Sequence, residues 1–112
     1  MNYITVEEGT AIVKPRGRFD NVLAHEIDPE IDEALINHGC NKIVVDLSET
    51  KFIDSSAIRT LAQAFRSVGK NNFEVKNILT DELAYMLYQN EVDEAWNVTP
   101  PLDHDYLRRQ FE

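Results

Sequence analysis

The chain is poor in cysteine and contains no long run of apolar residues. Cys40 is the only cysteine among 112 residues, so no disulfide can form within the chain. No stretch approaches the roughly 20 consecutive apolar residues that span a bilayer. The first ten residues also lack the basic start and apolar block of a secretory signal. The sequence therefore predicts no membrane insertion and a cytoplasmic location.

Positive charge is also scarce. Eleven Lys and Arg residues stand against twenty Asp and Glu residues, which gives a net charge of −9. Nucleic acids and anionic lipids are bound mainly through Lys and Arg, so we do not expect a nucleic acid as the partner. The acidic balance fits a protein-binding role, and it fits plain solubility equally well.

Clusters that would support catalysis are missing. His25, His38 and His104 occur singly, and no Cys/His group has the spacing of a metal site. The four glycines do not form a phosphate-binding loop. A serine nucleophile would need a nearby base and an oxyanion site. The sequence offers only the N-terminus of a helix, which could serve as the oxyanion site. We therefore expect no metal, no cofactor and no enzymatic activity.

The length and the hydrophobic periodicity fit a single α/β domain over residues 1–112. Strands are expected at 2–6, 10–14, 42–47, 73–78 and 95–98, and helices at 21–37, 55–68, 80–88 and after Pro100-Pro101. The order is β-β-α-β-α-β-α-β-α. It predicts a mixed central sheet of about five strands with about four helices on one side or both.

Two residues set local geometry within this order. Gly9 can supply the positive φ of a tight hairpin turn between the first two strands. Pro29 interrupts the first helix, because proline removes a backbone hydrogen bond. The helix is therefore expected to bend near residue 28, or a new helix begins there with Asp28 as its N-cap.

The segment VVDLSETKFIDSSAIRTLAQAF, residues 44–65, carries the main functional signal. A buried strand ends in Asp-Leu-Ser, a short loop follows, and Asp54 then caps a helix with Ser55 and Ser56 as its first residues. Free backbone N–H groups and the helix dipole favour an anion there, and Arg59 follows one turn later. From the physics alone, Asp-Ser-Ser is better explained as an ordinary helix start than as a phosphorylation site.

Residues 52–65 resemble the phosphoacceptor segment of the STAS domain found in anti-sigma factor antagonists. Gly17-Arg18-Phe19-Asp20 resembles the corner that this family has between its second strand and first helix. The expected element order also matches along nearly the whole chain. The resemblance implies a STAS-like fold.

The resemblance also implies a function. Ser55, or as a second choice Ser56, would be phosphorylated by an anti-sigma factor or related serine kinase that binds the unmodified chain. A metal-dependent serine phosphatase would then remove the phosphate. The alternative is a constitutive STAS docking subunit of a transporter or a multiprotein sensory complex, in which the same corner is never modified.

The expected partner-binding residues come from the two corners and the helix that follows the second one. They are Asp20, Asn21, Thr50, Lys51, Asp54, Ser55, Ser56, Ala57 and Arg59, with Gln63 and Arg66 further along the same helix. Ala57 stands where the family usually has glycine, and its methyl group is expected to block the closest backbone approach by a partner.

Overall fold

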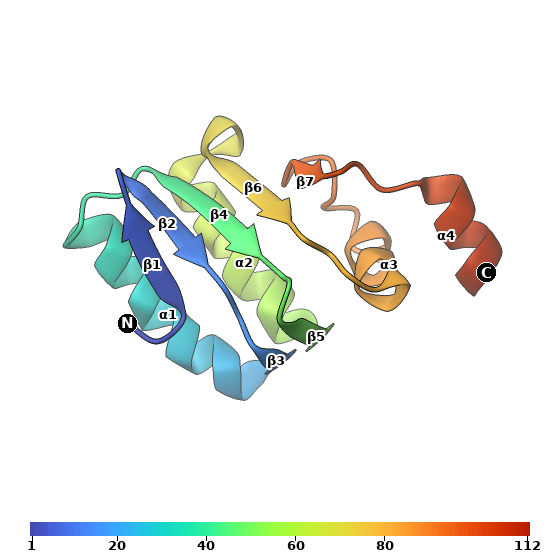
Figure 1. The fold of residues 1–112 in the computed structure, drawn as a ribbon, viewed down its shortest axis with the longest axis horizontal. Coiled ribbons are helices and arrows are strands. Elements are labelled where there is room, and N and C mark those ends of the chain that lie inside the picture. The colour runs from blue at the N-terminus through green and yellow to red at the C-terminus, as the bar shows by residue number, and fades with distance from the viewer.

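The computed structural model describes residues 1–112, and its centre is a mixed sheet of five strands (Figure 1). The strands lie in the order β1-β2-β4-β6-β7, with β1 antiparallel to β2 and all other neighbours parallel. The elements are β1 Ile4–Glu7, β2 Thr10–Val13, β3 Gly17–Phe19, α1 Asn21–Ile36, β4 Lys42–Asp46, β5 Thr50–Ile53, α2 Ser55–Val68, the 3-10 turn η1 Lys70–Asn72, β6 Phe73–Lys76, α3 Asp81–Gln89, β7 Val98–Thr99 and α4 His104–Phe111. The predicted α/β class with a mixed sheet is confirmed.

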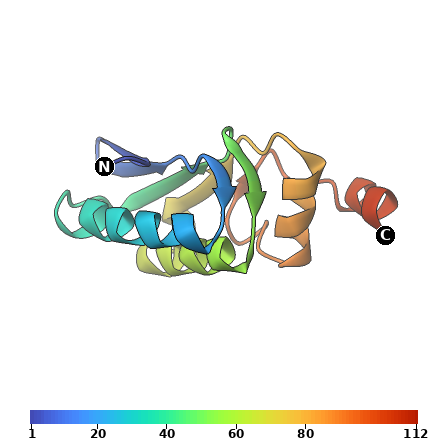
Figure 2. The ribbon, with the colours of Figure 1, turned by 90° about the horizontal axis from the view of Figure 1, so that it is seen from below.

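Helices α1 and α2 cover one face of the sheet, and no helix covers the other (Figure 2). Side chains of a strand alternate between its two faces, and buried apolar residues recur at every second position of the central strands. They are Ala11 and Val13 of β2, Ile43 and Val45 of β4, and Phe73 and Val75 of β6. The hydrophobic core therefore lies between the sheet and this pair of helices.

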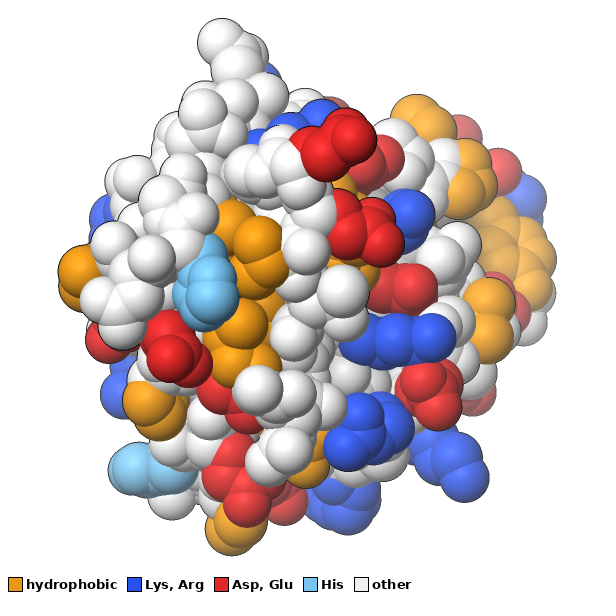
Figure 3. Space-filling view, turned by 60° about the vertical axis from the view of Figure 1, so that its left-hand side comes forward, with side chains coloured by type: hydrophobic (Ala, Val, Ile, Leu, Met, Phe, Trp, Pro, Cys, Tyr) orange, Lys and Arg blue, Asp and Glu red, His pale blue; other side chains and the backbone are white.

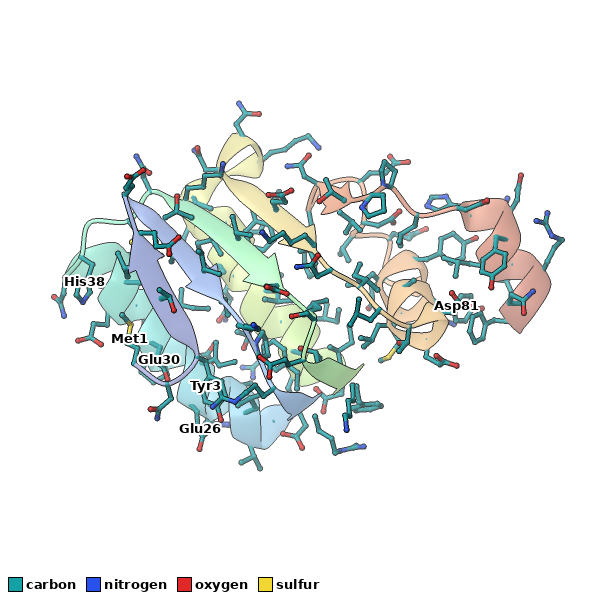
Figure 4. All side chains as sticks on the ribbon, in the orientation of Figure 1. Met1, Tyr3, Glu26, Glu30, His38 and Asp81 are labelled. Atoms are coloured by element: carbon teal, nitrogen blue, oxygen red, sulfur yellow. The ribbon has the colours of Figure 1, made fainter.

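The turn between β1 and β2 is the predicted hairpin. Glu8 and Gly9 both have positive φ, at 48° and 79°, as a two-residue type I′ turn requires. The start of the edge strand is tied to α1, because the backbone N–H of Tyr3 donates to Glu30 Oε1 at 2.9 Å (Figure 4). The guanidinium of Arg16 lies 4.5 Å from the centre of the Tyr3 ring. These contacts fix one end of an otherwise open edge.

Helix α1 runs unbroken through Pro29. The alternative of a new helix beginning at Asp28 is therefore wrong. The reason is the buried stripe, which continues on both sides of the proline as Leu23, Ala24, Ile27, Ile31 and Ala34. Packing of this stripe against the sheet and α2 outweighs the single backbone hydrogen bond that proline removes.

The C-terminal third differs from the prediction mainly in its last strand. β7 is only Val98–Thr99, whereas residues 95–97 lie in a turn, so the predicted strand at 95–98 is misplaced. Trp96 is nonetheless buried and packs edge-on against Phe73, with ring centres 5.8 Å apart. Helix α4 contacts α3, and Tyr106 Oη donates to Asp81 Oδ2 at 2.6 Å.

Candidate functional site

Two short parallel strands bring the two predicted corners together. β3 pairs with β5 in a separate two-stranded sheet, with Phe19 opposite Ile53. The residues at 50–53, predicted to be a loop, are therefore a strand. Each strand leads directly into a helix, β3 into α1 and β5 into α2. The pairing consequently places the starts of α1 and α2 next to each other.

An aspartate caps each of these helices. Asp54 Oδ1 accepts from the backbone N–H groups of Ser56 at 2.8 Å and Ala57 at 3.2 Å. Asp20 Oδ1 accepts from the N–H of Leu23 at 3.2 Å. The starts of α1, α2 and α3 follow one another along the lower edge of the ribbon in Figure 1. The predicted N-cap role of Asp54 is confirmed.

Ser55 is the first residue of α2 and lies in the middle of this row. Its side chain is exposed, whereas that of Ser56 is half-buried. The first backbone N–H groups of a helix have no partner within the helix and, with the helix dipole, favour an anion. Of the two serines, Ser55 is thus the more accessible to a modifying enzyme. A phosphate on it would lie at the positive end of α2.

Two of the predicted partner-binding side chains are not accessible. Thr50 is 4% exposed, and its hydroxyl donates to the carbonyl of Pro15 at 2.8 Å. Ala57 is completely buried in the core. The prediction was wrong for both, because Thr50 closes the loop before β3 and the Ala57 methyl points into the protein. That methyl group therefore does not block a partner.

The other predicted residues keep some exposure. Asn21, Lys51, Ser55, Arg59, Gln63 and Arg66 are exposed, and Asp20, Asp54 and Ser56 are half-buried. The structure brings most of them together around the starts of α1 and α2. Their role in binding a partner remains a prediction.

The sequence does not mark three further residues, which lie in β3, at the start of α1 and just before α3. Arg18 of β3 lies over the ring of Phe52 in β5, with its guanidinium carbon 4.1 Å from the ring centre. Val22 in the first turn of α1 and Leu79 just before α3 are exposed apolar side chains. No local pattern marks them, because their placement depends on strand pairing and on how the helices pack.

Removing the α2 cap should destabilise the fold by a measurable amount. Asp54→Ala deletes the acceptor of two backbone N–H groups, and we expect a loss of about 1 kcal/mol in the free energy of unfolding. Asp54→Asn retains an oxygen acceptor and should lose much less. Urea unfolding of the two variants tests this. Equal stabilities would show that the cap does not hold the start of α2.

Asp46 at the end of β4 should make stability depend on pH. Its Oδ1 accepts from the backbone N–H of Ser48 at 2.9 Å and from the side-chain amide of Asn77 at 3.1 Å. Partial burial acts to raise the pKa of Asp46, but these hydrogen bonds and the charge of Lys14 together outweigh it and lower the pKa.

A carboxyl group whose pKa is lower in the folded state stabilises the fold above its unfolded pKa. That contribution is lost as the pH falls through the folded pKa. Asp46→Asn should therefore lower the urea midpoint at neutral pH, and the difference from the unmodified chain should shrink in acid. A difference that is constant with pH would contradict this explanation.

Neither a metal site nor a membrane helix is found. No group of three or more His, Cys, Asp or Glu side chains is placed to bind a metal ion. Each helix is also too short or too polar to cross a bilayer.

Comparison with known protein families identifies the family to which this chain belongs. The model of the STAS domain matches residues 3–76, about two thirds of the chain. The chain belongs to the STAS domain family. The matched part of this STAS domain contains both corners and all of α1 and α2. A comparison with curated protein sequences gave no match.

Solved structures with the same fold cover nearly the whole STAS domain. An anti-sigma factor antagonist from Mycobacterium paratuberculosis is 21% identical, with a TM-score of 0.73 over 96% of this chain and 89% of its own. The phosphorylated form of the Bacillus cell fate determinant SpoIIAA is 15% identical, with a TM-score of 0.64 over 95% of each chain. A sulfate transporter family protein from Wolinella succinogenes is 19% identical, with a TM-score of 0.68 over 94% of this chain and 89% of its own.

Proposed function

We propose that this STAS domain is a phosphorylation-controlled anti-sigma factor antagonist. It binds an anti-sigma factor, or a similar regulator that is a serine kinase, while Ser55 is unmodified, and it releases that partner when Ser55 is phosphorylated. A metal-dependent serine phosphatase restores the binding form. The chain itself performs no catalysis and acts in the cytoplasm by changing partners.

The observation that carries this proposal is the exposed Ser55 at the first position of α2 in a STAS domain. A phosphate there adds a charge of about −1.5 to −2 at neutral pH. The fold tolerates it, since the helix start favours negative charge. A partner docked on the same surface would instead meet a new anion. Modification of Ser55 therefore changes binding without unfolding the protein.

The likeness to anti-sigma factor antagonists supports the proposed class of partner, and the likeness to phosphorylated SpoIIAA supports control by phosphate. The likeness to the Wolinella sulfate transporter family protein supports the alternative, a constitutive docking subunit. The two functions differ in one property, namely whether Ser55 is ever modified.

Mass spectrometry of the chain purified from its native cells distinguishes these two functions. We expect a fraction of the chain to carry one phosphate that phosphatase removes and that fragmentation places on Ser55. The same chain with Ser55→Ala should lack it. An unmodified chain under several growth conditions would favour the constitutive docking subunit.

A further inference from the structure

We propose that the surface around Ser55 binds an acidic patch on its partner protein, and that phosphate acts by cancelling the local positive charge that attracts this patch. The inference rests on the proposed function and specifies the chemistry of the partner. The observation behind it is that exposed basic side chains lie near Ser55, although the whole chain is acidic.

Three basic side chains come from the three elements that meet at the start of α2. Arg18 belongs to β3, Lys51 to β5 and Arg59 to α2, and all three are exposed. The ion pairs of the chain are Lys14 with Glu49, His104 with Asp93, and Arg108 with Asp105. None of the three bases is therefore neutralised by a carboxylate within the chain. Their charge remains available to a partner.

This local charge contrasts with the rest of the molecule. The chain has a net charge of −9. On the surface that contains Ser55, in contrast, three exposed bases outnumber the two half-buried cap carboxylates, Asp20 and Asp54. Figure 3 shows Lys and Arg side chains along the right-hand side of the face that it displays, with Asp and Glu side chains among them. Complementary charge steers association and selects partners. A partner with a matching acidic patch would be drawn to this part of the molecule.

Exposed apolar side chains lie at the starts of α1 and α3. Phe19 and Ile53, the residues directly before the caps of α1 and α2, are completely buried. Leu79 holds the same position before Thr80, the cap of α3, yet it is 68% exposed. Val22 at the start of α1 is 71% exposed. Exposed apolar residues next to unpaired charges are typical of a protein interface.

The charge that phosphorylation adds exceeds the net charge of this surface. The three bases supply a charge of about +3, the two cap carboxylates Asp20 and Asp54 supply about −2, and a phosphoserine adds about −1.5 to −2. Arg59 lies one turn after Ser55, at the spacing that places two side chains next to each other on a helix. A phosphate on Ser55 would thus reverse the net positive charge of this surface and also repel an acidic partner directly.

Charge reversal tests this inference. The full chain is used to capture proteins from native extract, and the captured partner is identified and purified. Its affinity is then measured for the unmodified chain, for Arg18→Glu, Lys51→Glu and Arg59→Glu, and for Lys42→Glu. Lys42 is an exposed base at the first residue of β4 and is not one of the three bases of the Ser55 surface. Lys42→Glu is therefore a control with the same change in charge.

We expect each of the first three variants to bind about tenfold more weakly and Lys42→Glu to bind normally. The affinity of the unmodified chain should fall as salt rises from about 50 to 200 mM, because salt screens surface charges. Reversing an acidic residue of the partner to lysine should restore binding to Arg59→Glu. Circular dichroism confirms that each variant is folded.

The other outcomes separate this inference from the proposed function. If Ser55→Asp abolishes binding but charge reversal and salt do not weaken it, the acidic-partner inference is overturned and the proposed function stands. If charge reversal weakens binding but Ser55→Asp does not, the proposed switch fails, and with it the role of the phosphate. Capture of a second copy of this chain, a nucleic acid or no partner at all overturns the inference.

Discussion

Ser55→Asp is expected to weaken binding of the partner on the order of 100-fold while leaving the fold intact. The substitution puts a carboxylate at the first position of α2, on a surface that would be covered in the complex. An unpaired charge in an interface and repulsion from an acidic partner both act against binding. The same carboxylate interacts favourably with the helix dipole, by about 0.3 to 1 kcal/mol at an exposed position.

The expected result is therefore a loss of affinity without a loss of thermal stability. Isothermal titration with the purified partner gives the affinity, and calorimetry of the free chain gives the stability. Ser55→Ala should bind like the unmodified chain. Ser67→Asp serves as the control, because Ser67 is an exposed serine near the other end of α2. Normal binding by Ser55→Asp would contradict the proposed switch.

Phe19→Ala should produce the largest loss of stability among the residues next to the site. Phe19 is completely buried, and its carbonyl accepts the backbone N–H of Asp54 at 3.3 Å. Truncating a buried phenylalanine to alanine costs about 3 to 5 kcal/mol, because contacts are lost and a cavity remains. The pairing of β3 with β5 should loosen as a result, and the starts of α1 and α2 would no longer be held together.

Urea unfolding at neutral pH measures this effect. Phe19→Leu keeps most of the buried volume and should cost less than about 1.5 kcal/mol. A loss of less than 1 kcal/mol for Phe19→Ala would show that the corner does not depend on this side chain. In that case another contact would have to align the two helix starts.

Helix α2 and its cap were predictable because their determinants are local. Asp54 precedes a run with helical periodicity, and such a pattern indicates a helix start wherever it occurs. The hairpin turn at Gly9 follows from the same kind of local rule. The resemblance of residues 52–65, of the corner at residues 17–20 and of the expected element order then identified the family.

The pairing of β3 with β5 could not be predicted in the same way. Each strand has only three or four residues, and Gly17 and Thr50 give no clear alternation of apolar and polar side chains. Their pairing joins residues more than 30 positions apart in sequence. The burial of Thr50 and the proximity of Arg18 to Phe52 both follow from it. The sequence therefore predicted where the serine lies but only part of the surface around it.

Phosphate on Ser55 is expected to turn off binding of the partner protein. The most direct test is the affinity of one purified partner for the chain in its phosphorylated form and for the same sample after phosphatase treatment. We expect weak or undetectable binding before treatment and full binding afterwards, with no change in the fold. Equal affinity of the two forms would contradict this expectation and would leave this STAS domain as a constitutive docking module.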